Sequence, residues 1–192
     1  MRGLVRDRPA QDPSAQYHPK SIPNPPISAE HPAQDAHNIV TTPHNTAHKT
    51  FEACKHFQKL GYEIIIISNQ SGIHRGVFRK FDLEILNKWM LSQFSQNSIQ
   101  ILDVFYCPHG PESNCKCRKP KPGMFFKAKE KYCINMNLSW MIGDNETDIL
   151  AANRAGINNT ILFKTGSHKT QSETKARHVI EFIYQTKNLI TL

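Results

Sequence analysis

The segment YEIIIIS, residues 62–68, constrains the possible folds of this chain more than any other feature. Its four consecutive isoleucines are typical of a strand that is buried on both faces. Before this segment, apolar residues recur at helical spacing from Phe51 to Leu60, and Gly61 follows at the position of a left-handed helix cap. The pattern predicts a helix and then a strand of a parallel sheet that helices cover on both sides.

Helices and strands continue to alternate along the rest of the chain. The patterns predict helices near 79–96, from 122 to about 133 and at 146–156, and strands at 101–106, 138–143 and 159–163. The closing segment 172–190 fits either a helix or a short strand followed by a helix. This order, without internal repeats, predicts a doubly wound α/β fold whose ligand site lies at the carboxyl ends of the strands.

The first 50 residues differ in composition from the rest of the chain. They hold 8 of the 12 prolines and 5 of the 10 histidines but only one glycine. Prolines at this density interrupt a helix or a strand ladder before it gains length. We therefore expect an irregular, disordered segment at 1–50 and a folded domain at 51–192.

Charge and cysteine content narrow the class of protein. The formal net charge of +8 suits an anionic partner, and phosphate esters, nucleic acid and membrane surfaces all carry such charge. The chain has five cysteines, an odd number that does not suggest a secreted disulfide framework. No apolar window is long enough to span a membrane, and the first residues lack the core of a signal peptide. These features predict a cytoplasmic protein, and a monomer is the simplest expectation.

The stretch CPHGPESNCKCRKPKPG, residues 107–123, has the composition of a metal site. Two pairs of donors, each separated by one residue, supply three thiols and one imidazole from Cys107, His109, Cys115 and Cys117. Four such ligands fill a tetrahedral zinc site and leave no position for water, so the ion is expected to be structural. The other two cysteines, Cys54 and Cys133, fall in predicted helices and are expected in the core.

Polar loops follow three of the predicted strands, and parallel strands bring such loops to one edge. The first begins at Ser68, the second contains the metal ligands and then Arg118 and Lys119, and the third contains Asp144. Zinc at Cys117 would hold Arg118 and Lys119 over the strand ends, where a guanidinium and an ammonium can bind phosphate. Taken singly, these residues could also be turn caps or solvated charges.

The ordered segments IIIISNQSGIHRG, CPHGPESNCKCRKPKPGM and MIGDNETDILAA closely resemble the haloacid dehalogenase (HAD) superfamily. Within it, they resemble the zinc-containing D-glycero-D-manno-heptose 1,7-bisphosphate phosphatases and the related histidinol-phosphate phosphatases. The resemblance covers about 51–192. It implies a HAD-like, Rossmannoid fold and a phosphomonoesterase of carbohydrate metabolism that removes the 7-phosphate of the heptose in lipopolysaccharide precursor synthesis.

The resemblance also implies roles for individual residues, with Mg²⁺ and Zn²⁺ as cofactors. Ser68 would bind the transferring phosphoryl group, Lys119 would neutralise its charge, and Arg118 would recognise the substrate. Asn69, Gln70 and Ser71 would continue the substrate-binding loop. Asp144 would ligate Mg²⁺ with an added oxygen from Asn145, and Asp148 would orient that loop or cap the next helix.

The family's nucleophile is missing from its expected place. A D-x-D-G motif after an apolar strand should stand before about residue 38, because a βαβ unit needs roughly 30 residues. The nearest match is LVRDRP at 4–9, where Pro9 stands two residues after Asp7, and Asp12 and Asp35 lack any strand context. We therefore expect the first strand to be absent or abnormal, with Asp7 only a weak candidate nucleophile and little or no phosphatase activity.

Several alternatives remain open from the sequence. Residues 1–50 are either not the family's own sequence or part of a non-catalytic descendant that binds a phosphorylated sugar. A zinc knuckle that binds nucleic acid is less favoured, because aromatic residues for base stacking and a long basic stripe are lacking near 107–123. Heptose bisphosphate and histidinol phosphate both fit the quoted motifs.

Overall fold

The computed structural model describes residues 45–164 and 173–191. The expectations for residues 1–44, including those for Asp7, Asp12 and Asp35, lie outside the described residues. Within the described ranges, no helix is both long enough and apolar enough to cross a membrane.

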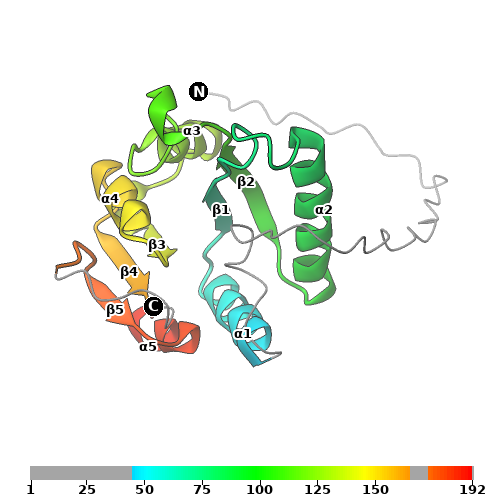
Figure 1. Cartoon of the computed structure of the whole chain (residues 1–192). Coiled ribbons are helices and arrows are strands. Elements are labelled where there is room, and N and C mark those ends of the chain that lie inside the picture. The colour runs from blue at the N-terminus through cyan, green and yellow to red at the C-terminus, as the bar shows by residue number, and fades with distance from the viewer. Residues whose placement is uncertain (1–44, 165–172, 192) are drawn as a thin grey trace, which may run out of the picture. The chain divides into compact units, whose positions relative to one another are not determined.

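Strands and helices alternate as the periodicity predicts (Figure 1). The strands are β1 (Ile64–Asn69), β2 (Ile101–Cys107), β3 (Trp140–Gly143), β4 (Asn159–Phe163) and β5 (His178–Ile180). The helices are α1 (Asn45–Lys59), α2 (Lys80–Gln96), α3 (Gly123–Tyr132), α4 (Glu146–Arg154) and α5 (Thr186–Leu189), with 3-10 turns at η1 (Pro111–Ser113), η2 (Met136–Leu138) and η3 (Ile183–Gln185). The closing segment is therefore a short strand followed by a helix.

Some boundaries differ from the expectation. Helix α1 begins at Asn45 rather than at Phe51, and β3 begins at Trp140 because the preceding residues form η2. Cys54 is buried in α1, as expected. Cys133 is not a core residue: it is exposed and caps the end of α3 in the left-handed conformation, with φ 53°. A residue in this conformation leaves the helix, so its side chain does not continue the buried face.

All strand pairs are parallel, and they form two separate groups. Strand β1 pairs with β2, with Ser68 opposite Tyr106, while β3, β4 and β5 pair in that order. Figure 1 shows the two groups, with β1 and β3 at their facing edges. In the part of the chain that the structure describes, no strand pairs with these two edges.

Two apolar clusters hold helices against the two groups of strands. One contains Phe125 of α3 and Ala151 of α4, and both Ile67 of β1 and Met141 of β3 pack against it. The other contains Phe57 of α1 and residues of β4 and β5, and the side chains of Trp140 and Ile142 pack against it. Helices therefore cover both faces, as a doubly wound fold requires.

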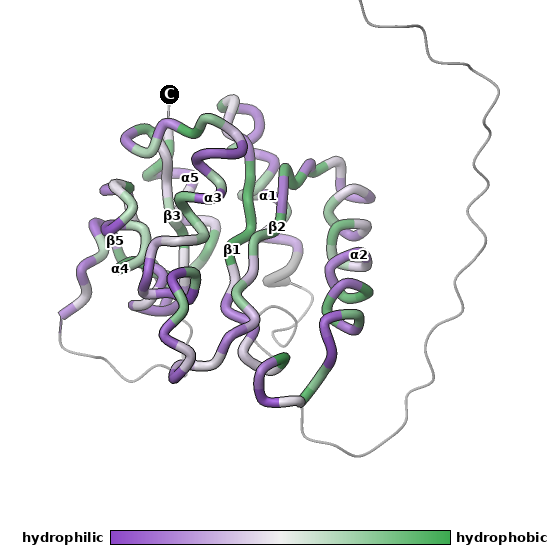
Figure 2. Tube along the Cα trace, turned by 90° about the horizontal axis from the view of Figure 1, so that it is seen from above, coloured by the Kyte–Doolittle hydropathy of each residue, from purple (hydrophilic) through white to green (hydrophobic). Residues whose placement is uncertain are grey.

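The expectation that β1 is buried on both faces is wrong. Figure 2 shows the hydrophobic residues concentrated along β1, yet all six residues of the strand are only half-buried. A strand with a partner on each side loses solvent contact along both edges, whereas the described residues give β1 a partner on the β2 side alone. The incomplete burial follows from this one-sided pairing.

Candidate active site

The carboxyl ends of β1 and β2 lie side by side and bring two of the expected loops together. Asn69 lies opposite Cys107 in the register, and the backbone N–H of Gln70 donates to the carbonyl of Cys107 over 2.7 Å. The side-chain amide of Gln70 also donates to the hydroxyl of Ser68 over 2.8 Å. The loop that begins at Ser68 is therefore anchored beside the start of the cysteine-histidine loop.

The four expected metal ligands form one cluster, with donor atoms that all lie within 4.8 Å of one another. The sulfur of Cys117 lies 3.2 Å from that of Cys107, 3.4 Å from that of Cys115 and 3.2 Å from Nδ1 of His109. Tetrahedral zinc with Zn–S bonds of about 2.3 Å would place two sulfurs about 3.8 Å apart. The donor set therefore fits a closed tetrahedral zinc site, in which the donor atoms would lie slightly farther apart than they do here.

The surroundings of the cluster affect its thiols in opposite ways. Burial raises the pKa of Cys107 to about 12. Burial would also raise the pKa of Cys115, but hydrogen bonds from the backbone N–H of Arg118 and from Cys117 outweigh it and lower this pKa to about 6. The loop therefore already stabilises a thiolate at Cys115, which is the form that binds a metal.

Contacts outside the four donors hold the loop in shape. Lys121 donates to the side-chain oxygen of Asn114 over 2.6 Å, and the N–H of Gly123 donates to the carbonyl of Lys116 over 3.1 Å. A Cβ atom on Gly123 would overlap that carbonyl, so glycine is required there. These contacts close the loop at the start of α3.

Arg118 and Lys119 follow Cys117 directly, but their side chains go to different places. Arg118 as a residue is half-buried, and its guanidinium donates an exposed hydrogen bond to the carbonyl of His109 over 3.2 Å, at the rim of the metal cluster. The side chain of Lys119 is only 8% exposed. Its ammonium donates to the carbonyl of Ile67 over 2.7 Å and forms an ion pair with Asp148 over 2.5 Å. Lys119 thus lies next to Ser68 on the β1 side.

Asn69 fixes the backbone of Lys119. Its side-chain oxygen accepts from the N–H of Lys119 over 3.0 Å, and its side-chain amide donates to the carbonyl of Lys119 over 3.1 Å. Both ends of the amide are therefore used to position the lysine. The expected contact of Asn69 with a substrate stays a prediction.

The turn between β3 and α4 supplies the acidic side of the site. Asp148 accepts from the backbone N–H of Asn145 over 3.2 Å and so caps α4, as expected. The oxygen of Asn145 accepts from the backbone N–H and the hydroxyl of Thr147, each over 3.0 Å. This oxygen therefore serves the helix cap, and Asp144 lies half-buried beside it.

The ion pair between Lys119 and Asp148 was not foreseen. It connects the two groups of strands, because Lys119 bonds to β1 and Asp148 lies against Gly143 at the end of β3. No local pattern could have shown it, because Lys119 and Asp148 are 29 residues apart in the sequence. Ser71, the last residue expected in the substrate-binding loop, lies in the loop after β1. Its backbone carbonyl accepts a hydrogen bond from the N–H of Arg75 over 3.0 Å.

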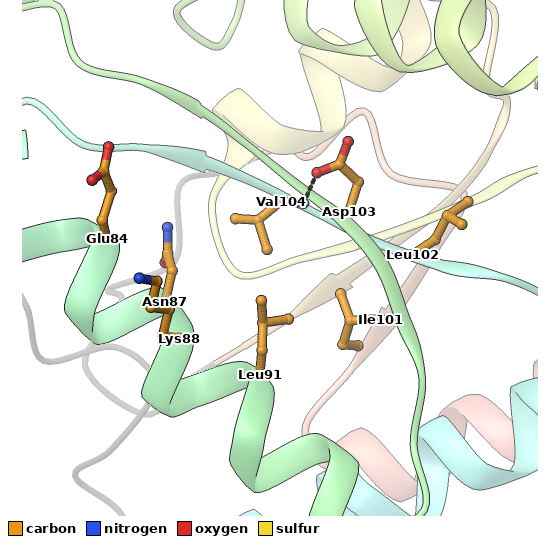
Figure 3. Close-up of a pocket in the computed structure, with 8 residues that line it drawn as sticks. All are labelled: Glu84, Asn87, Lys88, Leu91, Ile101, Leu102, Asp103 and Val104. Atoms are coloured by element: carbon orange, nitrogen blue, oxygen red, sulfur yellow. Dashed lines mark hydrogen bonds between the residues drawn. The ribbon is translucent and has the colours of Figure 1, made fainter. Parts of the chain in front are cut away.

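A hollow of about 350 Å³ lies elsewhere, between residues 84–91 of α2 and 101–104 of β2 (Figure 3). Its strand lining belongs to the amino-terminal half of β2, whereas the polar loops follow the carboxyl ends. This hollow is not the site that Ser68, Lys119 and the metal cluster form.

Comparison with known proteins agrees with this geometry. Residues 116–186 match the family model described as HAD-hydrolase-like. The chain is 38% identical over 149 residues to D-glycero-alpha-D-manno-heptose-1,7-bisphosphate 7-phosphatase of Photorhabdus laumondii, which covers 74% of this chain and 81% of that protein. It is 40% identical over 141 residues to D-glycero-beta-D-manno-heptose-1,7-bisphosphate 7-phosphatase of Vibrio cholerae, covering 69% and 76%.

A solved structure shows the same relation. The crystal structure of D,D-heptose 1,7-bisphosphate phosphatase from B. bronchiseptica, complexed with magnesium and phosphate, matches with a TM-score of 0.62 and 27% identity, over 72% of this chain and 79% of that one. The parallel α/β fold and the loops at its strand ends agree with these matches. This chain therefore belongs to the HAD-like hydrolases, in the family of the D-glycero-D-manno-heptose 1,7-bisphosphate 7-phosphatases.

Proposed function

We propose that this chain carries the part of a heptose 1,7-bisphosphate 7-phosphatase that binds the phosphorylated sugar and neutralises its charge, with little or no turnover by the sequence as it stands. The observation that carries the proposal is the convergence of Ser68, Lys119 and the Arg118-bearing zinc loop at one edge of the strands. The relatives named above act on this class of sugar, which favours heptose bisphosphate over histidinol phosphate.

Each of these groups has a physical role toward a phosphoryl group. The hydroxyl of Ser68 can donate to a phosphoryl oxygen, and Lys119 supplies a fixed positive charge beside it. Arg118 can bind a second phosphate or sugar oxygens through two donors. Zn²⁺ would be held by the Cys107 cluster as a structural ion, and Mg²⁺ at Asp144 would add charge next to the phosphate.

The proposal of low turnover depends on the missing nucleophile. No D-x-D-G motif occurs in the sequence, and the weak candidate Asp7 lies outside the described residues. Removing the nucleophile of a well-studied hydrolase lowers turnover by a factor on the order of 10⁶. Ser68, Lys119 and Arg118 at the strand ends can bind a phosphate and neutralise its charge, but they do not replace the missing nucleophile. We also propose that the protein is a monomer and that it acts in the cytoplasm. If it bound nucleic acid instead, the affinity for an oligonucleotide would fall steeply with salt concentration.

The test measures binding and turnover on the same zinc-loaded protein. In the presence of Mg²⁺, heptose 1,7-bisphosphate should raise the midpoint of thermal unfolding while releasing no phosphate above the protein-free background. Arg118→Ala should reduce the ligand-induced shift without preventing zinc binding. Magnesium-dependent phosphate release that Asp7→Asn abolishes would contradict the proposed inactivity, and the absence of any ligand-induced shift would contradict the binding role.

A further inference from the structure

The loop after β1, residues 70–79, contacts the zinc loop, residues 107–123, at two places. The first contact is the backbone hydrogen bond from Gln70 to Cys107 at the end of the strands. The second lies farther along both loops, where Nε2 of His74 and Oε1 of Glu112 are 2.5 Å apart. Neither His74 nor Glu112 belongs to the metal cluster or to the residues expected to bind a substrate. The pair joins the two loops that contain those residues.

The zinc loop sets the position of Glu112. This residue lies in η1, between the expected zinc ligands His109 and Cys115. The hydroxyl of Ser113 donates to the carbonyl of Gly110 over 2.8 Å and closes the turn. An ion bound to His109 and Cys115 would fix both ends of this short stretch. The carboxylate of Glu112 is therefore held in place when zinc closes the loop.

The side chains of His74 and Glu112 meet over Gly110. A Cβ atom at this position would overlap both the carboxylate of Glu112 and the ring of His74. The backbone of Gly110 has φ −72° and ψ 168°, an extended conformation that any residue adopts. Glycine is therefore not needed here for its backbone angles. Its missing side chain leaves the space in which the pair forms.

On the other loop, His74 is held within a set of tight turns. The N–H of Arg75 donates to the carbonyl of Ser71 over 3.0 Å, and the N–H of Val77 donates to the carbonyl of Gly72 over 2.9 Å. These two hydrogen bonds span His74 and connect it to the end of the expected substrate-binding segment. Anchoring His74 therefore restrains the turns that follow β1.

Glu112 carries a negative charge that also faces Arg118. A hydrogen bond from its own backbone N–H lowers the pKa of Glu112, and the charges of His74 and Arg118 lower it further. The carboxylate is thus ionised near neutral pH and accepts a hydrogen bond from the imidazole N–H. His74, Glu112 and Arg118 therefore lie together at the rim of the metal cluster.

We propose that His74 and Glu112 are positioning residues that form a latch, through which the zinc loop holds residues 70–79 in place at the carboxyl end of β1. The inference rests on the proposed function only for the ligand that this loop would bind. Both side chains are partly exposed, and an exposed pair of this kind changes an equilibrium constant by a factor of up to about five. Structural zinc thereby orders the loop that contains Gln70 and Ser71, in addition to Arg118 and Lys119.

Amide hydrogen exchange on the full zinc-loaded chain tests the latch without a substrate. The amides of Arg75 and Val77 should exchange about two- to fivefold faster in His74→Ala and in Glu112→Ala than in the wild type. The double variant should exchange no faster than either single variant, because both substitutions remove the same contact. Glu112→Gln keeps an oxygen that can accept from His74, so it should restore the wild-type rate.

Two further measurements complete the test. His48→Ala is the matched control, because it removes a similar exposed pair with Glu52 on α1, and it should leave the exchange of Arg75 and Val77 unchanged. Competition with a chelating dye measures the affinity for zinc. Because coupling between two events is reciprocal, His74→Ala should weaken zinc binding by about the same factor as it speeds the exchange.

Four outcomes would overturn the proposal. They are unchanged exchange in His74→Ala, exchange in Glu112→Gln as fast as in Glu112→Ala, an equal effect of His48→Ala, and faster exchange with unchanged affinity for zinc. With heptose 1,7-bisphosphate and Mg²⁺, His74→Ala should also reduce the ligand-induced thermal shift. If the wild type shows no such shift, the proposed function fails, while the exchange and zinc measurements still decide whether the latch exists.

Discussion

Replacing Lys119 by methionine tests whether the ion pair with Asp148 holds the two groups of strands together. The side chains of the pair are 8% and 6% exposed, so solvent cannot compensate for a lost partner. Lys119→Met leaves the Asp148 carboxylate buried without its cation, although it still accepts a hydrogen bond from the N–H of Asn145. Removing one member of a buried pair typically costs about 3–5 kcal/mol, and we expect this range.

An exposed ion pair in the same chain provides the control. Lys131 forms an ion pair with Asp103 over 2.8 Å, but its side chain is 58% exposed. Asp103 also keeps hydrogen bonds from the hydroxyl of Tyr132 and the N–H of Val104 when Lys131 is removed. Lys131→Met makes the same chemical change at the surface and should cost less than about 1 kcal/mol.

Urea unfolding of the zinc-loaded protein measures the difference between these two variants. The midpoint for Lys119→Met should fall strongly with an unchanged slope, and the thermal midpoint should fall by roughly 6–20 °C. Adding Asp148→Asn to Lys119→Met should recover part of the loss, because it removes the unpaired buried charge. The reasoning is refuted if Lys119→Met costs no more than Lys131→Met, or if the double variant is as unstable as the sum of the single ones.

Three further changes test the metal cluster, the titration of Asp103 and the packing of the acidic turn. Cys117→Ser should reduce bound zinc from about one equivalent to near zero by metal analysis, while Cys133→Ser, at an exposed position, should not. Burial would raise the pKa of Asp103, but hydrogen bonds from Lys131 and Tyr132 outweigh it and lower this pKa. The ionised carboxylate therefore contributes fully to the free energy of unfolding above the ordinary carboxyl pKa of about 3.9, and this contribution is lost as the pH falls through the lowered pKa. Thermal midpoints should therefore drop more for the wild type than for Asp103→Asn between about pH 5 and pH 3. Gly143→Ala would place a Cβ atom 2.5 Å from that of Asp148 and should cost about 1–3 kcal/mol in urea unfolding.

Local patterns account for the parts of the structure that the sequence predicted. The order of strands and helices depends on periodicity within short segments, and the metal ligands depend on donors that lie within one loop. The prediction that Cys133 lies in the core was wrong, because the end of a helix depends on one residue adopting the left-handed conformation. Boundaries of this kind are decided by single backbone angles, which a periodic pattern does not contain.

The chemistry of Lys119 depends on distant parts of the chain. Its partners are the carbonyl of Ile67 and the side chain of Asn69, both on β1, and the carboxylate of Asp148 on α4. The sequence predicted that these elements meet, because parallel strands share a carboxyl edge. It did not predict which way the lysine points, since that depends on contacts with residues that are far away in the sequence.

The half-buried β1 shows why an incorrect prediction can still carry information. Four consecutive isoleucines suit a strand with neighbours on both sides, and the burial of each residue depends on those neighbours being present. The described residues supply β2 on one side and, on the other, only the lysine contact at Ile67. Exposed strand edges next to apolar side chains invite pairing with another strand. Among the described residues, the composition of β1 therefore favours a second neighbour that the strand pairing does not provide, and the half-burial of its isoleucines follows from that difference.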